Sequence, residues 1–128
     1  LIFDVGQNKM LQNRATSQES YDRFVDRVRH SGQAYGLRSP DGGWAVCPSH
    51  ENEGVSVLVF WSDRAYAARH QKEDWSEYVP TAIALDEFIG AWLKGMHADG
   101  SMVGPNWDVN LCGLEVRAID LAKRLTEE

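Results

Sequence analysis

The sequence predicts a single α+β domain with a mainly antiparallel sheet of about five or six strands and three to four helices packed mostly on one face. Three observations predict this class. A chain of 128 residues fits one domain. Hydrophobic periods typical of helices and of strands are interspersed along it. The chain opens with a helical pattern, three strand patterns and another helical pattern, which favours an antiparallel sheet with helices on one side.

The composition excludes several classes of function. The net charge is -6 and the isoelectric point is about 5.1, whereas nucleic-acid and anionic-membrane surfaces require a basic field. No apolar run approaches the roughly 20 residues of a membrane-spanning helix. We therefore expect neither nucleic acid nor membrane as a partner, and a cytoplasmic location.

The amino-terminal segment predicts little structure of its own. Residues 1–9 show no hydrophobic period and no secretion-signal pattern, so residues 1–15 are expected to be a disordered or artificially added extension before a domain over 16–128. Thr16 and Glu19 have the spacing of a capping box, and Gly32 is a natural helix end. The helix between them carries one apolar stripe, formed by Tyr21, Phe24, Val25 and Val28.

Three strand patterns follow this helix. Asp41-Gly42 separates residues 34–39 from residues 44–49 and predicts a hairpin turn. Residues 55–61 are apolar at almost every position, which is typical of a central strand covered on both faces. We expect the three strands to form an antiparallel meander.

Ser62 follows the third strand directly and raises the question of a catalytic serine. A nucleophile elbow needs small residues around the serine, but Trp61 and Asp63 occupy those positions. Ser62 is therefore predicted to cap a short alanine-rich helix through its hydroxyl group. Asp63 would lie in the first turn of that helix, where the helix dipole favours a negative charge.

The carboxyl-terminal half repeats the alternation of strand and helix. Residues 81–85 predict a strand, Asp86 is expected to cap an amphipathic helix, and Asp99-Gly100 ends it. Residues 101–109 and 113–118 predict a second hairpin, and Asp120 is expected to cap a final helix. A helix reading of 114–118 stays open, because one helical face also includes Leu114, Ala118, Leu121, Ala122 and Leu125.

The order and spacing of aromatic landmarks resemble a known family. They are Tyr21-x-x-Phe24-Val25, Tyr35-Gly36-Leu37, Gly43-Trp44, Trp61 with Ala67, the run Trp75 to Pro80, Leu85 to Phe88 with Trp92-Leu93, and Asp99 to Gly104. Over residues 17–125 this pattern is similar to the bacterial domain-of-unknown-function family numbered 2750. The resemblance implies a small α+β fold in a cytoplasmic bacterial protein, and it carries no activity, cofactor or catalytic residue.

Candidate metal and catalytic groups are few. Cys47 and His50 have metal-ligand spacing, but structural zinc needs four ligands and only His97 and Cys112 remain to complete a site. We expect no metal and no cofactor, with both cysteines reduced. His30, His70 and His97 fall on predicted helices and are expected at the surface.

Five tryptophans are the most unusual feature of the composition. Trp75, Tyr78 and Trp107 lie at predicted strand starts or in loops beside acidic residues, a composition common in protein-binding surfaces. We therefore expect a non-catalytic protein-interaction module that uses these three residues, with a regulatory or immunity-like role by analogy of class.

Two other hypotheses stay open. The chain is alternatively a small enzyme or small-molecule binder that uses a cleft near Cys47, His50 and Asp63, whose side chains would then have to converge. Self-association through the exposed aromatic residues is the third hypothesis.

Overall fold

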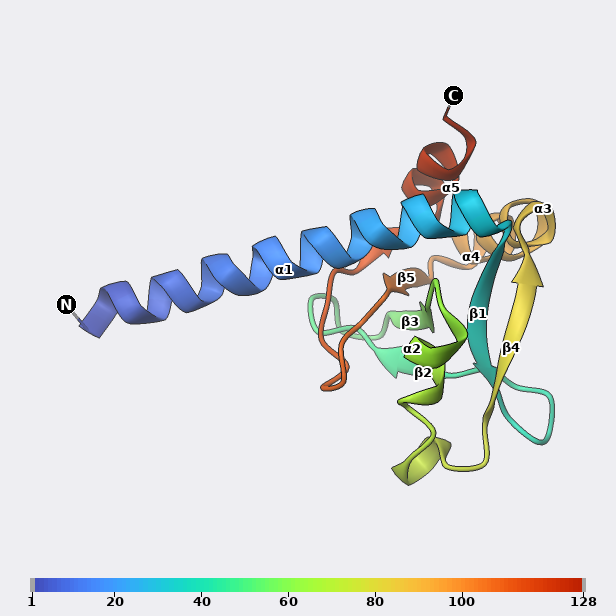
Figure 1. Cartoon of the computed structure of the whole chain (residues 1–128), viewed down its shortest axis with the longest axis horizontal. Helices are drawn as coiled ribbons and strands as arrows, with labels where there is room; N and C mark the ends of the chain where they lie inside the picture. The colour runs from blue at the N-terminus through green and yellow to red at the C-terminus, as the bar shows by residue number, and fades with distance from the viewer. Residues whose placement is uncertain (1, 128) are drawn as a thin grey trace.

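A long helix and two small sheets form the molecule (Figure 1). The computed structural model describes the main chain of residues 2–127 and the side chains of residues 14–127. Helix α1 runs from Ile2 to Ser31, and its amino-terminal part projects beyond the sheets in Figure 1. The capping-box start at Thr16 is therefore wrong, because the helix continues through that residue. The domain boundary near residue 15 stays a prediction.

The strands form two sheets. Strand β1 (Gln33–Arg38) pairs with β4 (Val79–Ala84) in an antiparallel ribbon. The second sheet has the order β2-β3-β5-β6, and only its β3–β5 pair is parallel. Its strands are β2 (Val46–Pro48), β3 (Ser56–Phe60), β5 (Met102–Pro105) and β6 (Val116–Arg117).

The predicted meander of the first three strands is only partly correct. The turn at Asp41-Gly42 forms, with Gly42 at a φ of +92°, and β2 pairs antiparallel with β3. Within residues 2–127, however, the backbone of β1 forms only isolated bridges beyond its own ribbon, to Trp44 and Trp61. Its ladder goes to β4 instead, from Gln33 opposite Ala84 to Arg38 opposite Val79.

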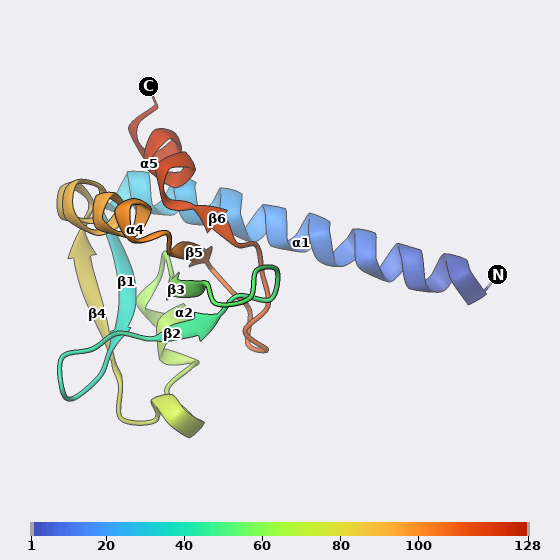
Figure 2. The same ribbon diagram turned by 180° about the vertical axis from the view of Figure 1, so that it is seen from behind.

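The remaining helices complete the fold. Leu85 to Asp99 form one helical segment in which α3 (Leu85–Glu87) and α4 (Lys94–Asp99) flank a π-helical middle, η2 (Phe88–Leu93). Gly100 ends it with a φ of +76°, as expected. Helix α5 (Ala118–Thr126) follows β6 directly, so residues 114–118 are not one long helix (Figure 2). Asp86 and Asp120 lie in first turns rather than at the cap positions, which Ala84 and Arg117 occupy.

The four-stranded sheet is covered on both faces, as predicted for its central strand. The larger core joins α1, η2, α4 and α5 to one face, and includes Phe24, Phe60 and Phe88. The smaller core lies on the other face, where Trp61 and Trp107 cluster with Ala67 of α2 (Arg64–Ala68) and with Trp75 of the 3₁₀ turn η1 (Glu73–Trp75). Strand β3 supplies both cores because alternate side chains of a strand point to opposite faces.

Candidate functional site

A cleft of about 480 Å³ opens over the smaller core. Its walls are β2, the segment from His70 to η1, and the loop between β5 and β6. The residues that line it are Val46, Cys47, Pro48, His70, Lys72, Glu73, Asp74, Trp75, Val109, Asn110 and Leu111.

The cleft carries unusual apolar exposure. Val46 and Val109 are 48% and 45% exposed, and both line the cleft. A third strongly exposed valine among the described side chains, Val79, lies on β4 outside it. Isolated exposed valines need no explanation, but two of them on one concave surface are typical of a contact site.

The backbone of the cleft is also unusual. Glu73 and Leu111 both line it and have φ values of 54° and 55°. Residues with side chains rarely adopt this left-handed conformation, and it persists only where the surrounding structure enforces it. The left-handed conformation costs energy in both loops that form walls of this cleft. Such strained positions cluster at functional sites.

Of the predicted binding residues, Trp75 lines the cleft, and Tyr78 lies beside Trp75 outside it. Both are half-buried, and their ring centroids are 6.2 Å apart. The side-chain amide of Gln71 donates to the Tyr78 carbonyl at 2.8 Å and holds the loop in place. Glu73, Asp74 and Glu77 are exposed around the two rings, so these aromatic residues have the acidic neighbours that the sequence indicated.

Trp107, the third predicted binding residue, has no exposed surface. Its indole N–H donates to the Leu114 carbonyl at 2.7 Å, and the ring fits between Gly104 and Gly113. A Cβ at Gly113 would overlap Cδ1 of Trp107. Trp107 therefore anchors the β5–β6 loop from inside, and its predicted role as a contact residue is corrected.

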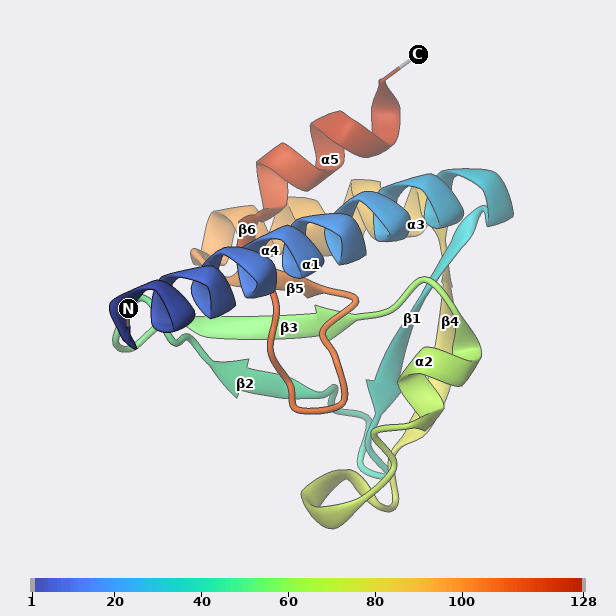
Figure 3. The same cartoon turned by 60° about the vertical axis from the view of Figure 1, so that its left-hand side comes forward.

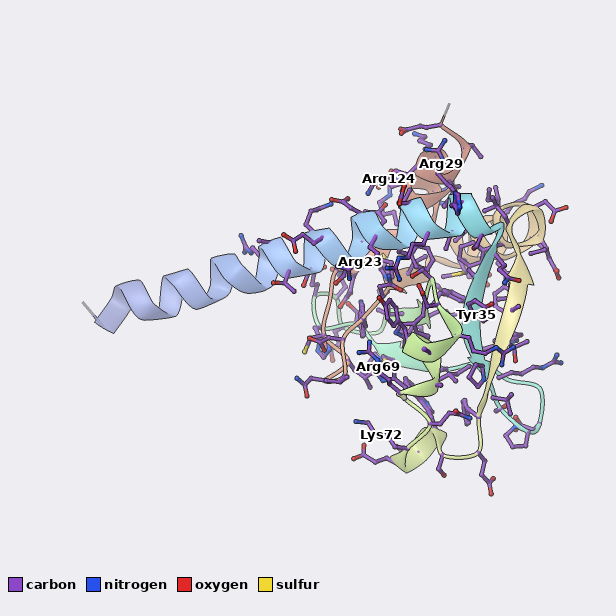
Figure 4. The ribbon with its side chains drawn as sticks, in the orientation of Figure 1. Arg23, Arg29, Tyr35, Arg69, Lys72 and Arg124 are labelled. Carbon is purple, nitrogen blue, oxygen red and sulfur yellow. The ribbon has the colours of Figure 1, made fainter. Side chains whose placement is uncertain are left out.

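His70 was expected at the surface, and this prediction is wrong. The residue is 1% exposed and stacks on Trp61 with ring centroids 4.8 Å apart. Its Nε2 atom has no hydrogen-bond partner among the described residues. Burial lowers the pKa of His70, and the positive charges of Arg69 and Lys72 add to the effect. The imidazole is therefore neutral at pH 7 and lines the cleft. Figure 4 labels Arg69 and Lys72, which flank His70 in the chain.

Ser62 does not occupy the predicted cap position, and its polar groups are hydrogen-bonded within the fold. Its main-chain N–H donates to Oδ1 of Asn106 at 2.8 Å, and Nδ2 of Asn106 donates to the Ser62 hydroxyl at 3.1 Å. That hydroxyl donates to Asp63, which occupies the cap position of α2 and accepts a bond from Arg27 at 2.9 Å. These hydrogen bonds connect the ends of β3 and β5 with α1 and therefore stabilise the fold.

The residues of the small-enzyme hypothesis do not converge. Cys47 lines the cleft, but His50 and Asp63 do not. The His50 ring lies 6.0 Å from the Trp107 ring, and the Asp63 carboxylate is engaged with Arg27. Burial raises the pKa of the Cys47 thiol, which disfavours the reactive thiolate.

Among the side chains that the structure describes, no three His, Cys, Asp or Glu residues are placed to share a metal ion. Within the same part of the chain, no helix has both the length and the apolar content needed to cross a bilayer.

One protein-family model matches most of the domain. Residues 21–125 match the family model described as "Protein of unknown function (DUF2750)". The chain belongs to the DUF2750 family. The match confirms the resemblance seen in the order of the aromatic residues, and it adds no activity. No curated protein and no solved structure matches the chain.

In this DUF2750 domain, sequence reasoning missed several residues of the cleft. Val46, Val109 and Leu111 carried no motif, and His70 was interpreted as a surface histidine. Two signals directed attention to parts of the cleft: the position of Trp75 beside Glu73 and Asp74, and the candidate cleft near Cys47. The rest of the cleft depends on bringing β2 and the β5–β6 loop beside the Trp75 segment.

Proposed function

We propose that this DUF2750 domain is a non-catalytic protein-interaction module that binds a segment of a partner protein at the cleft beside Trp75. The observation that carries the proposal is the placement of Val46 and Val109, both strongly exposed, on one concave surface with the half-buried ring of Trp75. A buried aromatic or aliphatic anchor surrounded by polar groups is the usual composition of a contact site that binds tightly.

The chemistry of the cleft supports binding rather than catalysis. Its histidine is neutral and its cysteine has a raised pKa, so the pair lacks an activated nucleophile. The charged residues that line the cleft beside Trp75 are Glu73 and Asp74 against Lys72, which favours a partner segment with positive charge. The bacterial, cytoplasmic and regulatory or immunity-like character of the protein stays a prediction from family resemblance and class analogy.

A displayed library of random peptides, panned against the purified protein, tests the proposal. We expect enriched peptides whose binding is lost in Val46→Asp and weakened in Trp75→Ala. Val79→Asp is the matched control, because it places the same charge on an equally exposed valine outside the cleft. Circular dichroism checks that each variant is folded. Peptides that bind wild type and Val46→Asp equally would contradict the proposed site.

A small-molecule role has one observation in its favour, the unpaired Nε2 of the buried His70 in the cleft. A fragment screen by NMR would detect a bound small molecule as shifts of the His70 ring resonances.

Self-association is tested by sedimentation at increasing protein concentration, with Val46→Asp as the variant that should abolish any dimer formed through this surface.

A further inference from the structure

The open edge of β2 runs along the cleft. Strand β2 ends the order β2-β3-β5-β6, and Figure 3 shows it below β3, its one neighbour in this sheet. Alternate side chains of a strand point to opposite faces, and Cys47 packs into the smaller core while Val46 and Pro48 point the other way. All three nevertheless line the cleft. A cleft that touches side chains from both faces of a strand lies beside its edge.

The hydrogen-bond pattern shows which backbone groups face this edge. The Ser49 N–H donates to the Val55 carbonyl at 2.9 Å, so Ser49 points its backbone groups toward β3. In an antiparallel pair alternate residues share this direction, so Cys47 also faces β3. Val46 and Pro48 must then direct their backbone groups away from β3. The presence of a proline agrees with this, because its missing N–H is tolerated only on an open edge.

We propose that a partner segment binds by adding a strand to the edge of β2, and that the segment is extended and basic. This inference rests on the proposed function and specifies how the partner is held. The Val46 N–H and the carbonyls of Val46 and Pro48 supply the main-chain hydrogen bonds, and Val46, Val109 and Trp75 contact alternate side chains of the added strand.

Charge complementarity identifies the class of partner. Glu73 and Asp74 line the cleft on one side of the edge, against the single cation Lys72. Glu51 and Glu53 are exposed in the turn that follows β2. A segment that alternates basic and aliphatic residues would place its aliphatic side chains in the cleft and its cations beside these carboxylates.

Titration with the capped peptide Lys-Val-Lys-Val-Lys-Val, followed by NMR and amide hydrogen exchange on the wild-type protein, tests the inference. We expect binding at millimolar concentration or below, with exchange of the Val46 amide slowed by at least about tenfold. The Cys47 amide should be protected with and without peptide, because it belongs to the β2–β3 ladder.

Two control peptides separate backbone pairing from side-chain contact. The same sequence with every backbone amide N-methylated retains every side chain but cannot donate a main-chain hydrogen bond from either edge, and it should bind at least about tenfold more weakly. Glu-Val-Glu-Val-Glu-Val should also bind more weakly. Val46→Pro, which removes the outward N–H and leaves the β2–β3 ladder intact, should reduce affinity for the basic peptide.

The possible contrary outcomes have distinct meanings. Equal affinity for the methylated peptide, or unchanged Val46 exchange in the bound state, would overturn strand addition while leaving the proposed function in place. If the basic peptide does not bind, strand addition by a basic segment is also overturned. Panning of the displayed peptide library would then test the proposed function separately. Val46 protection that rises with protein concentration in the absence of peptide would assign the edge to a second copy of the chain and overturn the proposed partner.

Discussion

The indole Nε1–H of Trp61 donates a 3.0 Å hydrogen bond to the main-chain carbonyl of Trp107. This bond joins the end of β3 to the loop between β5 and β6, and both rings are completely buried. His70 stacks on the outer side of Trp61 and reaches the cleft. The two tryptophans therefore form the base on which the cleft is built.

Trp61→Phe should lower the free energy of unfolding by about 1–3 kcal/mol, because it leaves the buried Trp107 carbonyl without its donor. Chemical denaturation measures the change. Trp92→Phe is the matched control, since Trp92 is half-buried and its indole makes no hydrogen bond among the described residues. Equal losses in the two variants would show that ring volume, not the hydrogen bond, matters at Trp61.

Gly113→Ala should destabilise the protein by about 1–3 kcal/mol, because the new methyl group would overlap the ring of Trp107. Gly90→Ala is the control, since no atom lies within 4 Å of a Cβ at that helical position. It should be neutral or stabilising by up to about 1 kcal/mol. Thermal unfolding of both variants provides the comparison, and a neutral Gly113→Ala would refute the close fit around Trp107.

Asn106 combines a φ of 50° with hydrogen bonds to both the main chain and the hydroxyl of Ser62. Asn106→Gly retains the left-handed backbone and should cost about 1–3 kcal/mol for the lost hydrogen bonds. Asn106→Ala should cost about 1 kcal/mol more, because a residue with a Cβ is strained in this conformation. Denaturant unfolding of the pair separates the two contributions, and equal losses would mean that the conformation itself costs little.

Stability should fall as the pH drops below about 6.5, because of His70. Its pKa is lowered from the ordinary value of 6.5 in the folded protein, so the unfolded chain binds a proton at a pH where the folded one does not. The contribution of neutral His70 to the free energy of unfolding is fully present above pH 6.5, and it is lost progressively as the pH falls toward the lowered pKa of the folded state. Urea unfolding from about pH 5 to about pH 8 should show this slope in wild type and in His30→Asn. The slope should be missing in the variant His70→Phe, whose phenyl ring can still stack on Trp61.

Cys112 should react with iodoacetamide faster than Cys47 near neutral pH. Cys112 is exposed, whereas Cys47 is half-buried and burial raises the pKa of its thiol. Mass spectrometry of tryptic peptides measures both rates in one sample. Faster modification of Cys47 would point to an activated thiol and would favour the enzyme hypothesis. Addition of a cleft-binding peptide should slow Cys47 further and leave Cys112 unchanged.

The elements themselves could be predicted because their signals are local. The stripe from Tyr21 to Val28, the strand ending at Trp61 and the helix ends at Gly32 and Gly100 depend on periodicity and backbone preference within a few residues. The family could also be predicted, from the order of aromatic residues. The start of α1 was missed because a capping-box pattern at Thr16 is compatible with the interior of a longer helix.

Only the tertiary structure determined the pairing of β1 with β4, the burial of His70 and Trp107, and the cleft. Strand pairing depends on which apolar faces can be buried together, and that is a property of residues far apart in the sequence. A tryptophan in a loop is equally compatible with exposure and with burial, and only the approach of Gly104 and Gly113 decided the position of Trp107. By itself the sequence determined the fold class, the charge and the Trp75 segment, because those follow from composition and local order. The cleft exists because non-local packing places β2 beside that segment.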